Sequence, residues 1–100
     1  MKLYIDTTSS EVINLKLGTK FYKFSSKKEK SQMLLPVIAE TLNKNNLSPK
    51  DITGIEVNTG PGSYTGIRIG VSVACALGWS LGIPVNGKLL KDGKMPDIKY

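Results

Sequence analysis

A glycine-rich segment at residues 59–70 limits what this chain can fold into. It reads Thr-Gly-Pro-Gly-Ser-Tyr-Thr-Gly-Ile-Arg-Ile-Gly and directly follows an alternating apolar run that ends at Asn58. Glycines permit backbone angles with positive φ, and they let another backbone or an anion approach closely. The segment therefore predicts a strand, a tight turn and the N-terminus of a helix in direct succession.

The helix that follows, expected over 65–81, is apolar on more than one face. Between Thr59 and Gly87 the only charged residue is Arg68. At 100° per residue, one side of the helix carries small and aliphatic residues suited to packing on a sheet: Gly66, Gly70, Val73, Ala74 and Leu77. The opposite side carries Arg68, Ser72, Cys75 and Trp79, flanked by Ile69, Val71 and Ala76. Tryptophan and arginine are enriched at interface hot spots, so we predict that this side of the helix binds a protein partner. The alternative is that the first helix or the C-terminal tail covers it within the monomer.

The remaining pattern predicts an α/β fold. Three short runs with period-two character, at 3–5, 12–17 and 20–24, indicate an antiparallel meander. Ser26 to Glu29 fits a capping box, and the helix that follows to about residue 45 has Leu34, Ile38 and Leu42 as its core stripe, with Leu35 beside them. Met33 and Val37 lie off that stripe, as scattered surface residues or as a contact face. A single helical turn at 48–51, a strand at 52–58 and a last strand at 83–85 complete a five-stranded mixed sheet.

Composition sets the class of protein. One hundred residues make one small domain, and no apolar run reaches the roughly 18 residues that span a bilayer. A single cysteine and no signal-peptide pattern favour a cytoplasmic location. The net charge of +6, almost all from lysine, is typical of a solvated surface. It permits RNA nearby, although no aromatic-interleaved basic motif of a base-stacking module stands out.

The chemistry motifs are weak. The glycine segment lacks the Lys-Ser/Thr of a phosphate loop, because Ile67 and Arg68 stand there, and it does not match the dinucleotide fingerprint. Asp6 and Thr7 end the first strand, where a kinase-like sheet would hold a phosphate, but closure of a hairpin turn is the favoured explanation for them. The chain has no histidine, and burial among apolar neighbours would make Cys75 inert. We therefore predict neither catalytic residues, nor a metal site, nor a cofactor.

Three segments, in this order and spacing, closely resemble the TsaB (YeaZ) family: Leu3-Tyr4-Ile5-Asp6-Thr7-Thr8, Leu34-Leu35-Pro36-Val37-Ile38 and 60–70, with Ile83-Pro84 following. The resemblance covers residues 1–87 and leaves 88–100 as a short lysine-rich tail. It implies the N-terminal half of an actin-like ATPase (ASKHA, RNase H-like) fold. It also implies a non-catalytic scaffold that pairs with its paralogue TsaD, and with TsaE, in bacterial synthesis of threonylcarbamoyladenosine next to the tRNA anticodon.

In that family the two helices pack against the equivalent pair of a partner as a helical bundle. The predicted partner surface, for a TsaD-like paralogue or for a second copy when it is absent, comprises Met33, Pro36, Val37, Arg68, Ile69, Ser72, Cys75, Ala76 and Trp79. Contact with tRNA is expected only through the complex, and no membrane is implied. The second actin-like half does not follow in this sequence, so we expect no interlobe nucleotide cleft. The alternative function is nucleotide binding or ATP hydrolysis through a vestigial phosphate site at Asp6, Thr7, Gly60 and Gly62.

Overall fold

The computed structural model describes residues 1–9, 11–25 and 30–89 of the chain. Its elements follow in the order β1 (Lys2–Asp6), β2 (Val12–Leu17), β3 (Lys20–Ser25), α1 (Lys30–Lys44), the 3₁₀ turn η1 (Pro49–Asp51), β4 (Gly54–Val57) and α2 (Tyr64–Leu81). The order of strands and helices predicted from the sequence is confirmed up to the end of α2. The capping box at 26–29 and the tail at 90–100 lie outside the described residues.

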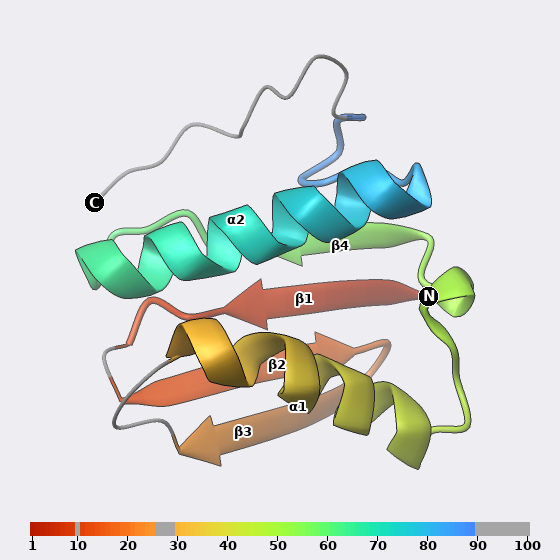
Figure 1. Ribbon diagram of the computed structural model, residues 1–100, viewed down its shortest axis with the longest axis horizontal. Helices are drawn as coiled ribbons and strands as arrows, with labels where there is room; N and C mark the ends of the chain where they lie inside the picture. The colour runs from red at the N-terminus through yellow and green to blue at the C-terminus, as the bar shows by residue number, and fades with distance from the viewer. Residues whose placement is uncertain (10, 26–29, 90–100) are drawn as a thin grey trace.

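The four strands form one mixed sheet in the order β3-β2-β1-β4. β1 pairs antiparallel with β2, β2 pairs antiparallel with β3, and β4 pairs parallel with β1. The parallel pair follows from the connection between them, because a strand that returns through a helix crosses over to lie in the same direction. Figure 1 shows α1 and α2 running along the sheet, with α2 in front of β4 and α1 in front of β2.

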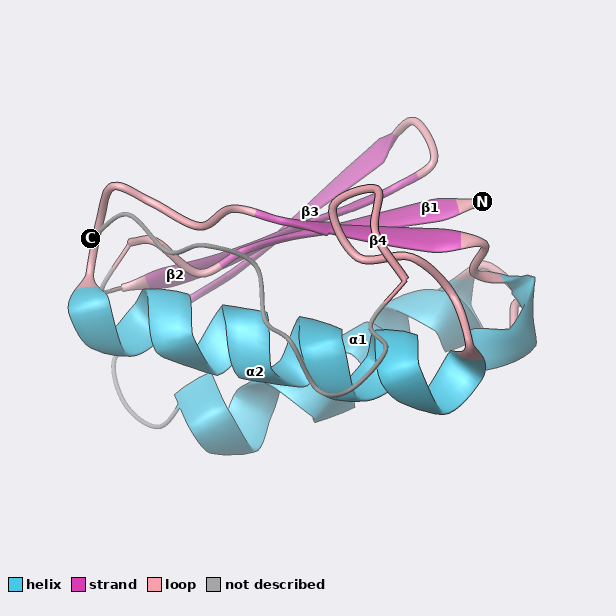
Figure 2. Ribbon diagram, turned by 90° about the horizontal axis from the view of Figure 1, so that it is seen from above, coloured by secondary structure: helices cyan, strands magenta, loops and turns pink. Residues whose placement is uncertain are grey.

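Both helices cover the same face of the sheet (Figure 2). Alternate residues of β1 and β2 point toward the helices and are almost completely buried: Leu3, Ile5, Ile13, Leu15 and Leu17. The helices add Leu34, Ile38, Ile67 and Val71 to this core, and β4 adds Ile55 and Val57. The residues between them in each strand are only partly buried. The protein is thus a two-layer α/β unit with one core between its layers.

The predicted fifth strand is wrong. Val85 makes only an isolated parallel bridge to Ile55 at the outer edge of β4. The chain turns back at once, because Asn86 and Gly87 adopt positive φ values of 50° and 81° and Lys88 bridges back to Val85. Pro84 has no backbone N–H to extend the pairing. The apolar pattern at 83–85 therefore marks a contact with the sheet that is one residue long.

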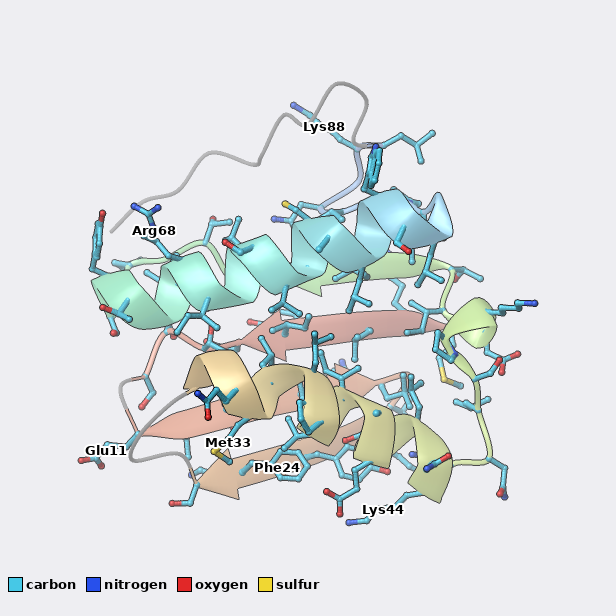
Figure 3. All side chains as sticks on the ribbon, viewed as in Figure 1. Glu11, Phe24, Met33, Lys44, Arg68 and Lys88 are labelled. Atoms are coloured by element: carbon cyan, nitrogen blue, oxygen red, sulfur yellow. The ribbon has the colours of Figure 1, made fainter. Side chains whose placement is uncertain are left out.

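The core stripe of α1 is confirmed, but the placement of two neighbours is wrong. Leu34, Ile38 and Leu42 are buried as predicted, whereas Leu35 is half exposed. Val37 is buried in the core, not off it, because β3 extends the sheet beneath this flank of the helix. Figure 3 shows Met33 on the side of α1 that faces Phe24 of β3, and both side chains pack partly buried against the core.

Candidate partner-binding surface

Local sequence places both ends of α2. At its start, the Ser63 hydroxyl accepts a hydrogen bond from the Gly66 backbone N–H at 3.2 Å. This is N-capping, which satisfies one of the free amides of the first turn. At its end, Gly82 adopts the left-handed conformation (φ 68°), and its N–H reaches the carbonyl of Gly78. The 18 residues between these caps include one charged side chain, Arg68.

Glycines bring α2 unusually close to the end of β1. A Cβ atom built on Gly66 would overlap the Thr7 carbonyl oxygen, and one built on Gly70 would overlap the Thr7 hydroxyl. A Cβ on Gly62 would lie 2.6 Å from the Thr8 Cβ atom. The fully buried Thr7 hydroxyl donates to the Gly66 carbonyl at 2.5 Å. The glycines of this segment therefore serve close packing of a helix on a strand.

The predicted phosphate-site residues gather at one end of the sheet. There the Asp6 carboxylate accepts hydrogen bonds from the Thr8 N–H at 2.9 Å and from the Thr8 hydroxyl at 2.7 Å. Its second oxygen lies 3.4 Å from the Asn58 side-chain nitrogen Nδ2, and the Asn58 side-chain oxygen Oδ1 in turn accepts from the Gly60 N–H. Asp6 thus closes the turn after β1, and its role toward a phosphate stays a prediction. Among the described residues, no group of three or more acidic, cysteine or histidine side chains is placed to hold a metal ion.

The outward face of α2 is exposed and almost uncharged. The exposed positions are Tyr64, Thr65, Arg68, Ser72, Ala76, Trp79 and Ser80. Trp79 has 69 % of its surface exposed, which is unusual for the residue with the largest apolar area. Arg68 is positioned by Tyr64 one turn earlier, whose hydroxyl accepts its Nη1–H at 2.8 Å. Surface helices normally present charged residues to water, so this face has the composition of a buried one.

Most residues of the predicted partner surface are accessible, and two are not. Pro36, Arg68, Ser72, Ala76 and Trp79 are exposed, while Met33 and Ile69 are partly buried. Val37 and Cys75 belong to the core, so their predicted place on an outward face is wrong. Whether the accessible residues contact a partner stays a prediction.

Cys75 is buried because the inward face of α2 is turned from the predicted one. This face centres on Ile67, Val71 and Ala74 and leaves Val73 and Leu77 only partly buried. Burial raises the pKa of the Cys75 thiol above its ordinary value of 9.0, which agrees with the expected inert cysteine. Leu35 and Ala39 of α1 are also exposed, and the sequence did not predict them as part of this surface. The sequence alone does not indicate that a leucine one position from a core stripe is half exposed.

Comparison with known proteins shows which family the chain belongs to. The family described as “TsaD: tRNA N6-adenosine threonylcarbamoyltransferase” matches residues 24–87. The chain belongs to this family. Relatives named “tRNA threonylcarbamoyladenosine biosynthesis protein TsaB” include one from Bacillus subtilis, 47 % identical over 60 residues, and one from Buchnera aphidicola subsp. Baizongia pistaciae, 37 % identical over 81 residues. These alignments cover 60 % and 77 % of this chain, but 26 % and 37 % of the relatives.

Two solved structures are also similar to this chain. A Pseudomonas aeruginosa protein described as having similarity to peptidase YEAZ superposes with a TM-score of 0.74 at 25 % identity, over 84 % of this chain and 40 % of that one. A structure of YeaZ from the same organism gives a TM-score of 0.73. The resemblance to the TsaB (YeaZ) family is therefore confirmed, and the chain spans well under half the length of these relatives. No described helix has the combination of length and apolar character needed to cross a bilayer.

Proposed function

We propose that the chain is a non-catalytic scaffold subunit in the synthesis of threonylcarbamoyladenosine on tRNA. In this proposal its helix layer, formed by α1 and α2, pairs with a TsaD-like paralogue. A TsaE-like ATPase joins this complex. Two copies of the chain pair when the paralogue is absent. The fold is then the N-terminal half of an actin-like ATPase, with tRNA met through the complex. The relatives' names support the pathway, and the uncharged outward face of α2 supports the pairing.

The exposed side chains of the helix layer explain why pairing would be favourable. Burying apolar surface contributes about 25 cal/mol per Å², and aromatic side chains contribute most at the centre of an interface. Trp79 would bury the most additional apolar surface on pairing, since it is 69 % exposed in the monomer. Pro36 and Ala76 are small enough for a partner helix to approach closely. Arg68, already positioned by Tyr64, would contribute a polar contact at the end of the surface.

The non-catalytic part of the proposal rests on the side chains the chain has. Its only cysteine is buried with a raised pKa, so the thiolate needed for nucleophilic attack is disfavoured. The sequence contains no histidine to act as a base for a serine or threonine. Both oxygens of Asp6 have partners: one accepts from Thr8 in the turn after β1, and the other from Asn58, which follows β4. The chain's contribution would then be to bind and position other subunits.

The test is association with the TsaD-like protein of the same organism, measured by sedimentation equilibrium. The wild-type chain should form a self-dimer that a one-to-one complex replaces. Ala76→Glu should abolish both, because an interface would bury an unpaired charge at a cost of about 3–5 kcal/mol. Thr19→Glu, in the exposed turn between β2 and β3, is the matched control and should pair like the wild type. If Ala76→Glu pairs normally while both variants are folded, the helix layer is not the interface.

A nucleotide-binding function is the alternative. It is supported by the position of Asp6 and the glycine segment, which meet where the parallel strands β1 and β4 end. Ligands of open α/β sheets bind at such ends. Calorimetric titration with ATP and magnesium tests it: heat that disappears in Asp6→Asn would favour this function, and no heat at millimolar nucleotide would remove it.

A further inference from the structure

The face of the sheet opposite the helices carries charged and aromatic side chains. Figure 2 shows that neither α1 nor α2 covers this face. Strand alternation places on it the side chains that point away from the core: Lys2, Tyr4, Asp6, Asn14, Lys16, Phe21, Lys23 and Glu56. We call this set the open sheet face. The Lys2 ammonium lies 3.1 Å from the Glu56 carboxylate, so these two charges offset each other at one side.

Phe21 is the most distinctive residue of the open sheet face. It is 76 % exposed, the largest fraction of any large hydrophobic side chain among the described residues. It lies on β3, opposite Lys16 in register, and the Lys16 ammonium is 5.0 Å from the centre of its ring. RNA-binding sheets stack unpaired bases on exposed aromatic side chains of this kind.

A hollow beside this ring has room for a flat ligand. It measures about 390 Å³ and is lined by Tyr4, Asp6, Asn14, Leu15, Phe21, Tyr22 and Lys23. Its polar groups suit the edge of a nucleobase, because the Asn14 amide both donates and accepts hydrogen bonds. Lys23 lines the hollow together with Asp6, and the Lys16 ammonium lies over the Phe21 ring, so two lysines offer positive charge to a phosphate chain.

We propose that the open sheet face binds single-stranded RNA, with a base stacked on Phe21 and the backbone phosphates on Lys16 and Lys23. A protein partner is disfavoured at this face, since its ionic side chains would be costly to bury. This arrangement is not evident from the sequence, because Lys16 belongs to β2 whereas Phe21 and Lys23 belong to β3, and they come together only when the two strands pair. The proposal goes beyond the scaffold function: it assigns RNA contact to this chain itself, on the layer opposite the proposed protein interface.

The test is fluorescence anisotropy of a fluorescein-labelled ten-nucleotide oligouridine titrated with the purified chain at several salt concentrations. Phe21→Ala should weaken binding about 5- to 150-fold, the range found for removing one stacked base. The double variant Lys16→Gln, Lys23→Gln should lower the slope of log K against log salt by about 1.4, at roughly 0.7 per phosphate contact on a single strand. Leu89→Ala removes an exposed apolar residue outside the open sheet face and should bind like the wild type.

The results separate this proposal from the scaffold function. Phe21→Ala should still pair with the TsaD-like protein, because its position is on the other layer, and its thermal unfolding should match that of the wild type. Absence of binding by the wild type, unchanged affinity in Phe21→Ala, or an unchanged salt slope in the lysine variant would each overturn the RNA site. None of these results would affect the pairing measured by sedimentation.

Discussion

The contact between Gly70 and Thr7 gives the sharpest test of how the fold is held together. Gly70→Ala adds a Cβ atom that overlaps the Thr7 hydroxyl, which is fully buried and already bonded to Gly66. Alanine favours a helix over glycine by about 1 kcal/mol, but overpacking a core typically costs about 1–3 kcal/mol. The overlap with the buried Thr7 hydroxyl is severe, so we expect the cost to lie in the upper part of its range, at about 2–3 kcal/mol. After the gain in helix propensity, Gly70→Ala should lower the free energy of unfolding by about 1–2 kcal/mol.

Thr7→Ala removes the same overlap from the other side. Alone it loses a buried hydrogen bond, worth about 1 kcal/mol, and leaves a small cavity worth about another 1 kcal/mol. In that background the methyl group added by Gly70→Ala has space, so the second substitution should be neutral or stabilising by up to about 1 kcal/mol. The coupling energy of the cycle should thus be about 2 kcal/mol, well above the roughly 0.5 kcal/mol expected of independent sites.

Urea unfolding followed by circular dichroism measures all four free energies. Gly82→Ala is the matched control, because nothing lies within 4 Å of the Cβ it would gain and only its positive φ penalises a side chain. It should be insensitive to Thr7→Ala. If the effects of Gly70→Ala and Thr7→Ala simply add, the glycine is not there for close approach, and the packing interpretation of residues 59–70 fails.

Three further predictions concern other parts of the molecule. The Asn86 side-chain amide makes two hydrogen bonds with the backbone of Val57, at 2.8 and 3.1 Å. Asn86→Gly keeps the positive φ but loses both bonds, so it should lower the free energy of unfolding by about 1–2 kcal/mol. It should also speed hydrogen exchange at the Val57 amide. Burial raises the pKa of Cys75 above 9.0, and burial first, then Asp6, raises that of Tyr4 above 10.0. The folded state therefore retains protons that the unfolded state has lost, and stability should be level up to about pH 9 and then fall in urea titrations at higher pH. Trp79 is the single tryptophan, so its fluorescence should shift to the blue when the TsaD-like protein binds, and an unshifted spectrum in a formed complex would place the interface elsewhere.

Local patterns in the sequence predicted the elements of this fold because each is specified by neighbours along the chain. The alternation in β1 and β2 and the 3.6-residue stripe of α1 directly mark which residues face the core. The glycine segment predicted the turn into α2 for the same reason. The last strand was mispredicted because apolar residues at 83–85 look alike whether they pair once or several times. Its length was decided by the turn at Asn86, where the side chain replaces the backbone as the partner of Val57.

The candidate surface was predicted less completely, because rotation of a helix about its axis depends on what lies beside it. The sequence indicated that α2 has too few charges to face water, but not that Cys75 would lie in the core. Val37 was misplaced because β3 extends the sheet under its flank of α1. The open sheet face was missed altogether, since its residues meet only once β2 and β3 pair. Pairing across strands is information that no single stretch of sequence contains.

The way β4 ends has a consequence for how copies of this protein meet. Its outward backbone groups are already bonded: Ile55 to Pro84 and Asn86, and Val57 to the Asn86 side chain. A strand from another molecule would find no free donors or acceptors along these residues. The opposite edge is β3, where lysines at 20 and 23 discourage strand addition, as they do on many natural edges. The sheet is therefore protected against growing sideways into a fibril, so an exposed tryptophan can be tolerated on the helix layer without the protein becoming prone to aggregation through its strands.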